Sequence, residues 1–326
     1  MANFEIVAFA SETQEWDAML QNSFEGNIFF SQLYLQNSSV PFSCYIVQKG
    51  QSVKAGFVVL EDPSKEQSVL DELIIYSGIF FLEDPTHKES KVRAQRFAIS
   101  EAVIEFLDTH YTKIAMQLSP QFEDIRPFLW HNYHAENLNA KFRVDVRYTS
   151  YLNIAGIRSG TNGLESSVFK GFDTIRQRNI KEARKKSAYT KIELQLSLFM
   201  QYYEALLASQ EITLSIQKRE NMARLIAALI QNNKANMYIS YNAQAQVQYI
   251  TIFCWDHKRA YYLFGAPNPE AGARYKGSIC FWDAFVDLAQ RGVDEVDLEG
   301  VNSPQRGWFK LSFGGDLRSY FRVVKG

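Results

Sequence analysis

Residues 261–290 read YYLFGAPNPEAGARYKGSICFWDAFVDLAQ. The segment opens with aromatic and apolar residues typical of a β-strand, passes through a loop rich in glycine and proline, and closes with apolar residues at helical spacing. A strand that leads through a short loop into a helix is a building unit of α/β folds. We therefore expect an α/β domain in this half of the chain, with the loop at the N-terminus of the helix.

The sequence on both sides extends this pattern into a whole domain. Upstream, apolar periodicity predicts helices at 172–187, 198–209 and 217–231 and strands at 237–241, 247–255 and 259–264. Downstream, two further strands are expected at 295–298 and 319–324. This order predicts a mixed, largely antiparallel sheet flanked by helices.

The first half of the chain repeats the order. A capping signature, Ser11-x-x-Gln14, predicts the start of a helix. It precedes β-rich runs at 44–47, 53–60 and 73–82, a helix at 90–111 and strands at 114–118 and 142–154. The sequence therefore predicts two tandem α/β domains. The glycine-rich stretch AGIRSGTNG at 155–163 predicts a linker, and we divide the 326 residues into domains 1–155 and 156–326.

Composition limits the class of protein. The formal net charge is −1, so no overall field attracts nucleic acid or an anionic membrane. No basic segment leads into an apolar stretch at residue 1, and no apolar run approaches the length of a membrane span. We expect a cytoplasmic protein without an integral membrane segment. The sequence contains no recognisable metal site, Ser-His-Asp set or Walker loop, and it leaves the oligomeric state open.

The loop at 271–278 is a candidate anion site. It contains Arg274, Lys276, Gly277 and Ser278 and leads into a helix, whose N-terminus offers free N–H groups and a positive dipole end. The alternative is a connection with solvated basic residues. The matching loop of the first half, EDPTHKES at 83–90, is acidic and has no glycine, so we do not expect it to hold phosphate.

The helix IRQRNIKEARKK at 175–186 carries a concentrated positive stripe. At 100° per residue, its cations fall opposite the apolar face, and such a stripe suits RNA or a diphosphate: these are Arg178, Lys181, Arg184 and Lys185. The alternative is the solvated face of an amphipathic helix. Arg176 differs because it projects near the apolar face, where it must be paired or reach out to solvent.

The strand VDEVDLEGV at 293–301 supplies two carboxylates. Its period of two places Asp297 and Glu299 on one face, near the end of the strand. A carboxylate there could accept the proton of an attacking amine. The alternatives are a surface acidic pair or a role in capping the following loop.

Residues 262–315 resemble the FemABX branch of the GNAT superfamily, which comprises aminoacyl-tRNA-dependent peptidyltransferases and the related BioF2-like acyltransferases. The resemblance rests on YLFGAPNPE, KGSICFWDAF, VDEVDLEGV, GWFKLSFGG and the basic helix upstream. Arg274-x-x-Gly277 matches the first positions of the GNAT pyrophosphate loop, but Ile279 stands where that pattern has Gly or Ala. The segment FFSQLYLQ at 29–36 also lacks the lysine that resembling enzymes place just after it.

The resemblance implies two tandem GNAT-like domains, the first with a degenerate phosphate loop and the second with the donor site. It implies an N-acyltransferase acting on a small-molecule or lipid-linked amine, in cell-envelope or peptidoglycan precursor synthesis. The donor would be aminoacyl-tRNA or acyl-coenzyme A, with no tightly bound cofactor. Lys310 would stabilise developing charge, and donor contacts would come from Arg176, Arg178, Lys181, Arg274, Lys276, Gly277, Ser278 and Phe309. The competing hypothesis is a non-catalytic GNAT-like protein that binds an anionic ligand or a protein partner.

Overall fold

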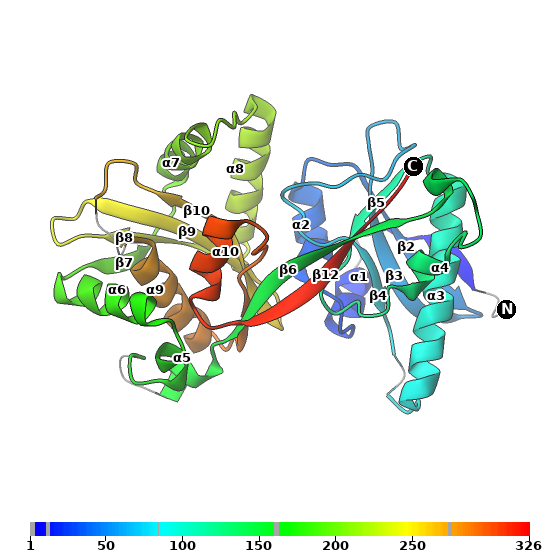
Figure 1. Ribbon diagram of the computed structural model, residues 1–326, viewed down its shortest axis with the longest axis horizontal. Coiled ribbons are helices and arrows are strands. Elements are labelled where there is room, and N and C mark those ends of the chain that lie inside the picture. The colour runs from blue at the N-terminus through cyan, green and yellow to red at the C-terminus, as the bar shows by residue number, and fades with distance from the viewer. Residues whose placement is uncertain (1–3, 11–13, 84, 160–162, 273–275) are drawn as a thin grey trace. The chain divides into compact units, whose positions relative to one another are not determined.

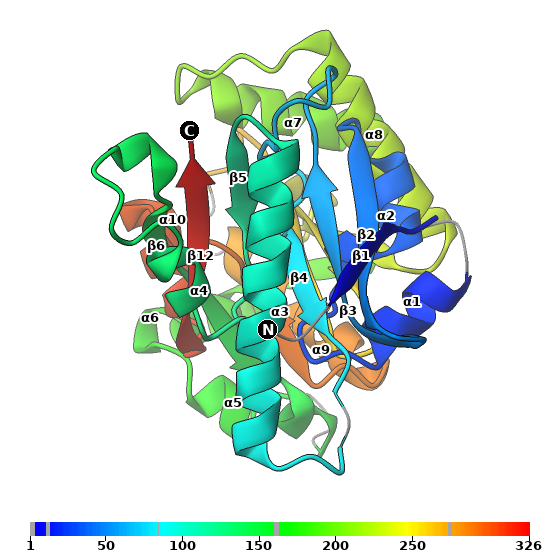
Figure 2. The same ribbon diagram turned by 90° about the vertical axis from the view of Figure 1, so that its right-hand side faces the viewer.

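The computed structural model describes residues 4–10, 14–83, 85–159, 163–272 and 276–326. The chain forms two compact units: unit 1 comprises Met1–Arg147 with Ser319–Gly326, and unit 2 comprises Tyr148–Arg318. Each unit combines strands and helices, as Figure 1 and Figure 2 show from two sides. The predicted α/β class with largely antiparallel sheets flanked by helices is confirmed.

Unit 1 is built on a four-stranded antiparallel sheet in the order β1-β2-β3-β4. Its long helix α3 buries residues four apart, Ile99, Val103 and Leu107, because that spacing forms one apolar face. The strands are β1 (Glu5–Ala8), β2 (Phe42–Lys49), β3 (Ser52–Leu60), β4 (Gly78–Phe81) and β5 (Ile114–Gln117). The helices are α1 (Gln14–Gln21), η1 (Ile28–Phe30), α2 (Gln32–Asn37), α3 (Glu89–His110), α4 (Arg126–Trp130) and η2 (Leu138–Ala140).

Unit 2 contains strands in the order β6-β11-β10-β9-β8-β7, antiparallel except for the parallel pair β10 and β11. The strands are β6 (Arg143–Asn153), β7 (Tyr189–Ile192), β8 (Ala235–Tyr241), β9 (Val247–Trp255), β10 (Arg259–Pro267), β11 (Glu295–Asp297) and β12 (Asp316–Lys325). The helices are η3 (Ala155–Ser159), α5 (Ser167–Lys170), α6 (Thr174–Lys185), α7 (Leu196–Ala208), α8 (Ile216–Gln231), α9 (Lys276–Gln290) and α10 (Pro304–Leu311).

Within unit 2, α6 and α9 cover one face of the sheet, and α7 and α8 cover the other (Figure 1). Helix α9 is apolar on almost every side and lies at the centre of the core, where its aromatic residues pack on Phe172 and Phe313. A helix that is apolar all round must be buried on all sides. This burial fixes the position of its N-terminus relative to the sheet.

The same order of elements occurs in both units. In unit 1 it is β2-β3-β4-α3-β5-α4, and in unit 2 it is β8-β9-β10-α9-β11-α10. The strand that follows each series runs across a unit boundary, because β6 continues into unit 2 and β12 ends in unit 1. The sequence prediction missed the short elements β7, α5 and α10, whose four to eight residues are too few to show a period.

The glycine-rich stretch at 155–163 is not a linker between the compact units, which divide at Arg147 and Tyr148 rather than at the predicted 155 and 156. Its first residues form η3 inside unit 2, where Ile157 is buried. Arg158 donates to the carbonyls of Ala289 and Val293 and so satisfies the C-terminal end of α9. Glycine content alone misled the prediction, because the buried Ile157 and the capping Arg158 anchor the segment.

Two tryptophans test the packing of unit 2. The Trp282 side chain is fully buried, and its ring centroid lies 5.2 Å from Phe169 and 5.6 Å from Phe172. We expect Trp282→Ala to lower the free energy of unfolding by about 3–5 kcal/mol, measured by urea denaturation. The matched control is Trp308→Ala on α10, where 74% of the residue is exposed. Its effect should stay within about 0.5 kcal/mol. Equal decreases in the free energy of unfolding of the two variants would contradict the central position of α9.

Candidate functional site

The strands β10 and β11 part at the end of the sheet where the candidate residues lie. They pair in parallel from Arg259 with Glu295 to Tyr261 with Asp297. Beyond that point β10 continues beside β9, with a register shift after Tyr262, whereas the Leu298 amide donates to a carbonyl of β6. In open α/β sheets, ligands bind beyond the carboxyl ends of parallel strands. A ligand of unit 2 is therefore expected beyond the end at which β10 and β11 part.

Lys310 lies near the end of α10 and is a buried cation, with 8% of the residue exposed. Its Nζ donates to the Gly300 carbonyl at 3.2 Å and lies 4.8 Å from the centroid of the Tyr262 ring. Burial lowers the pKa of Lys310 to about 8, against the attraction of the Glu299 carboxylate. A lysine whose pKa is about 8 can hold or release a proton in the physiological pH range.

Glu299 is the acidic partner of Lys310. The residue is 6% exposed, and its Oε1 has no hydrogen-bond partner among the described residues. Burial raises the pKa of Glu299 well above its usual range, although the Lys310 charge opposes the rise. Glu299 also has a left-handed backbone with φ of 56°. A buried carboxyl and a buried amine with shifted pKa values form a typical signature of a functional site.

Asp297 has a different environment from Glu299. It is fully buried, and its Oδ1 accepts hydrogen bonds from the Thr149 hydroxyl and, at 2.8 Å, from the Glu299 amide. The alternative of a surface acidic pair is therefore wrong for these two residues, because β6 and the following loop cover the end of β11. Asp297 has the loop-capping contacts that the sequence left as its other alternative.

Aromatic residues surround the N-terminus of α9. A Cβ atom on Gly277 would meet the Phe309 ring at 3.3 Å and the Tyr249 ring at 3.4 Å, so glycine permits this close packing. The hydroxyls of Tyr249 and Tyr262 are hydrogen-bonded to each other. Gly277 therefore lies beside Phe309, the neighbour of Lys310. The structure brings these predicted residues into one neighbourhood.

Arg176 connects three helices. Its guanidinium donates to the hydroxyls of Ser278 on α9 at 2.5 Å and Ser312 after α10 at 2.9 Å. It also stacks on Phe309, with 4.4 Å from Cζ to the ring centroid. Burial lowers its pKa, and Asp173 opposes this effect. The sequence predicted that Arg176 must be paired or reach out to solvent, and its two described hydrogen bonds go to neutral hydroxyls.

The rest of the predicted basic set is more dispersed. Arg178 and Lys181 are exposed on α6, and Lys181 lies 5.6 Å from the Phe169 ring centroid. Arg184 forms an ion pair with Asp283. Arg274 lies outside the described residues, and of Lys276 only the backbone, at the start of α9, is described. The structure therefore leaves the anion loop itself as a prediction.

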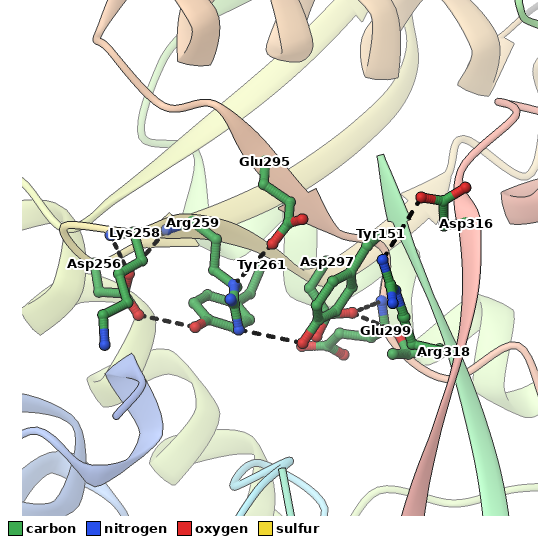
Figure 3. A network of polar contacts seen from close by, with 11 residues as sticks. Tyr151, Asp256, Lys258, Arg259, Tyr261, Glu295, Asp297, Glu299, Asp316 and Arg318 are labelled. Carbon is green, nitrogen blue, oxygen red and sulfur yellow. Dashed lines mark hydrogen bonds and ion pairs between the residues drawn. The ribbon is translucent and has the colours of Figure 1, made fainter. Parts of the chain in front are cut away.

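Sequence reasoning missed a buried ionic network beside the site, shown in Figure 3. Arg259 is buried, lies 3.2 Å from Glu295 and donates to the Tyr151 hydroxyl at 3.2 Å. The Tyr261 hydroxyl donates to Asp256 at 2.8 Å. In sequence, Arg259 and Glu295 each alternate with apolar residues on a strand, but nothing indicated that the two strands are parallel neighbours. The network joins β10, β11 and β6 where the parallel pairing of β10 and β11 begins.

Unit 1 contains a large cavity that does not show the same chemistry. It has a volume of about 610 Å³ and is lined by Phe81, Phe97, Phe122, Arg93, Arg96 and Arg126, with acidic residues among them. The three arginines pair with Glu89, Glu83 and Asp124, and Arg96 also pairs with the buried Glu25. Paired charges stabilise a surface without providing a free acid or base. The buried pair of Lys310 and Glu299 therefore favours unit 2 as the position of the functional site over the cavity of unit 1.

Residues 175–307 match the family model described as an acetyltransferase (GNAT) domain. Unit 2 therefore carries a GNAT domain. None of the curated proteins matches the chain by sequence. The GNAT domain contains α9, β11, Glu299 and the parting of β10 from β11, so the candidate site lies in the matched region apart from Phe309 and Lys310, which follow it by two and three residues.

Solved structures resemble the whole chain at low sequence identity. FemX has a TM-score of 0.65 and 10% identity, with 97% of this chain and 96% of that chain covered. A tandem GNAT protein from the clavulanic acid biosynthesis pathway has a TM-score of 0.53 and 10% identity, covering 99% and 98%. L-PGS from Bacillus licheniformis has a TM-score of 0.55 and 9% identity, covering 98% and 93%. The predicted resemblance to tandem GNAT and FemABX-like proteins is confirmed at the level of the fold.

Two kinds of feature are absent from the residues that the structure describes. Within those residues, no helix is long and apolar enough to cross a membrane. In the same part of the chain, no group of three His, Cys, Asp or Glu side chains is arranged to hold a metal ion. Cys44, Cys254 and Cys280 are buried free thiols.

The titration of Lys310 can be measured directly. We expect it to lose its proton at about pH 8, whereas the unfolded chain should show the usual value near 10.5. Between these pH values the unfolded chain binds the proton and the folded chain does not, so the cost of burying this group falls and the free energy of unfolding rises as the pH rises. NMR of lysine labelled at ¹³Cε measures the pKa of Lys310 in the folded chain and in a urea-unfolded control. The Lys310→Met variant assigns the signal. A folded-state value near 10.5 would contradict the burial of the ammonium.

Proposed function

We propose that unit 2 transfers an acyl or aminoacyl group from an activated donor to an amine acceptor. The observation that carries the proposal is the buried pair of Lys310 and Glu299 where β10 and β11 part. The GNAT domain match supports acyl transfer as the reaction class. Acyl transfer needs one group to accept a proton and one to stabilise an oxyanion, and this pair contains one of each.

Glu299 and Lys310 can together serve the proton transfers and the charge that develops during the reaction. The acceptor nitrogen attacks the acyl carbonyl, forming a C–N bond, and the carbonyl oxygen becomes an oxyanion. The Lys310 ammonium stabilises that charge in a site from which water is largely excluded. The raised pKa of Glu299 makes its carboxylate a stronger base for the proton of the attacking nitrogen. The C–S or C–O bond of the donor then breaks, and a proton from the pair passes to the leaving group.

The donor should carry an anionic portion near the start of α9. The free N–H groups of a helix N-terminus attract anions, and Arg176 stands beside them with neutral hydroxyl partners. Both acyl-coenzyme A and aminoacyl-tRNA meet this requirement. The resemblance of the sequence to the FemABX branch favours an aminoacyl donor and an acceptor that is a peptidoglycan precursor or a lipid-linked amine, and the fold likeness to FemX supports that resemblance.

A non-catalytic binding protein is the competing hypothesis. It predicts that Lys310, Glu299 and the start of α9 are scattered over the surface. Instead, Lys310 interacts with Glu299, and its neighbour Phe309 contacts Gly277. A protein that only binds an anion has no need for a desolvated carboxyl beside a desolvated amine. The convergence of these groups therefore favours the enzyme hypothesis.

The role of Lys310 is tested by Lys310→Met in an acyl-transfer screen with acyl-coenzyme A and aminoacyl-tRNA donors and amine acceptors. Methionine keeps much of the packing of the side chain and removes the charge, so turnover should fall about 10²–10³-fold with little change in stability. Lys191→Met makes the same change at an exposed lysine of β7 and should leave turnover intact. Normal turnover in folded Lys310→Met would refute the role, and a higher KM alone would make Lys310 a donor contact.

Salt dependence distinguishes the two donors. If the basic face of α6 binds the RNA of an aminoacyl-tRNA, affinity should fall steeply with salt, because each phosphate contact releases counterions. Replacing Lys181, Arg184 and Lys185 by Gln should flatten the plot of log affinity against log salt, measured by fluorescence anisotropy with labelled tRNA. Absence of tRNA binding, or an unchanged slope in the triple variant, would leave this face as solvated surface and favour acyl-coenzyme A.

A further inference from the structure

The chain makes a β-bulge where Glu299 leaves the sheet. Strands β11 and β6 are antiparallel, and Leu298 N donates to Ser150 O at 2.9 Å. The next bond along this edge runs from Val301 N to Tyr148 O at 3.0 Å. Two residues, Glu299 and Gly300, therefore stand opposite the single residue Thr149. This two-against-one count defines a bulge, and bulges turn a side chain away from the regular alternation of a strand.

The bulge directs two groups of the candidate site toward Lys310. The Gly300 carbonyl accepts the hydrogen bond of Lys310 Nζ, and the Glu299 carboxyl interacts electrostatically with the same ammonium. In an unbroken strand, the side chain of Glu299 would continue the regular row of Glu295 and Asp297. The left-handed φ of 56° at Glu299 breaks that row. For a residue other than glycine, this conformation needs support from its surroundings.

Three side chains provide that support. Asp297 Oδ1 accepts from the Glu299 amide, and the Thr149 hydroxyl donates to the same oxygen. On the far side of the bulge, Asn302 accepts from Tyr148 N at 2.8 Å and donates to Tyr148 O at 3.0 Å. Thr149 and Asp297 are fully buried, so water cannot replace their hydrogen bond. The bulge is thus fixed at both ends by side chains from β6, β11 and the loop.

We propose that Thr149 and Asp297 are positioning residues that hold the bulge at Glu299 and Gly300, so that the Glu299 carboxyl and the Gly300 carbonyl face Lys310. The assignment rests on the proposed function, because it gives Glu299 and Lys310 their roles. Asp297 then acts through the backbone of Glu299 and not as the proton acceptor. The charged groups that face Lys310 in this arrangement are Glu299, Asp297 and Arg306.

The test removes the Thr149 hydroxyl while keeping the volume of the side chain. In Thr149→Val, the carboxyl of Glu299 is no longer held close, so the pKa of Lys310 should fall by about one pH unit, measured by ¹³Cε-lysine NMR. Thr149→Ser keeps the hydroxyl and should restore the wild-type titration. Thr251→Val is the matched control, since Thr251 is a buried strand threonine whose hydroxyl donates to the Phe264 carbonyl at 3.2 Å. It should leave Lys310 unchanged.

The turnover measurement separates positioning from general damage. Thr149→Val should lower kcat by about tenfold or more with little change in KM, and Thr149→Ser should not. If Thr149→Val fails to fold, Asn302→Ala replaces it, because Asn302 is exposed and supports the other end of the bulge. An unchanged Lys310 titration in these variants would overturn the positioning role. The NMR measurement needs no substrate, so a Lys310 shift without any acyl transfer would support the bulge and refute the proposed function.

Discussion

The candidate site depends on the interaction between Lys310 and Glu299, two ionisable side chains that are buried side by side. Burial disfavours the charged form of each group, while the attraction between them favours both charges. The two effects oppose each other, so the location of the proton is sensitive to small changes in distance and in access of water. Elements that set these two quantities therefore control the chemistry of unit 2, including elements that touch neither group.

The helix α10 is one such element. A Cβ atom on Gly307 would lie 2.5 Å from the Val301 carbonyl, so glycine allows the helix to pack directly on the segment that follows the bulge. On the other side, Phe313 stacks on Phe281 of α9, Phe309 meets the same ring edge to face, and the Arg176 guanidinium lies over Phe309 and Phe313. Lys310 is thus held between a polar bulge and an aromatic cluster. The aromatic cluster excludes water, and the bulge supplies the acceptors.

The two units distribute charge differently although they repeat the same order of elements. In unit 1, the loop before α3 is acidic, and the arginines around the cavity are paired with carboxylates at short range. In unit 2, Arg176 has hydroxyl partners and Glu299 has a buried oxygen without a hydrogen bond among the described residues. Buried carboxyl oxygens without a hydrogen bond among the described residues also occur in unit 1, at Glu25 and Glu61. Glu25 is paired with Arg96, whereas Glu299 lies beside the buried Lys310.

The sequence by itself determined most of the regular elements and the superfamily. Strand β9 begins and ends at the predicted residues 247 and 255, and α8 begins one residue before the predicted 217 and ends at the predicted 231. Such elements follow from apolar periodicity and flanking turn residues, which are local properties. The candidate residues were also found in sequence, because their motifs lie in short contiguous segments.

Only the tertiary structure decided the surroundings of those residues. The Thr149 hydroxyl that supports Asp297 is 148 positions away in the chain, and the serine that binds Arg176 on α9 is 102 positions away. The alternation of the strand placed Asp297 and Glu299 on one face, but the bulge at Glu299 gives the two residues different surroundings. Burial, hydrogen-bond partners and the resulting pKa shifts arise when distant segments meet. No local pattern records which segments will exclude water from a side chain, and this exclusion sets the chemistry of Lys310 and Glu299.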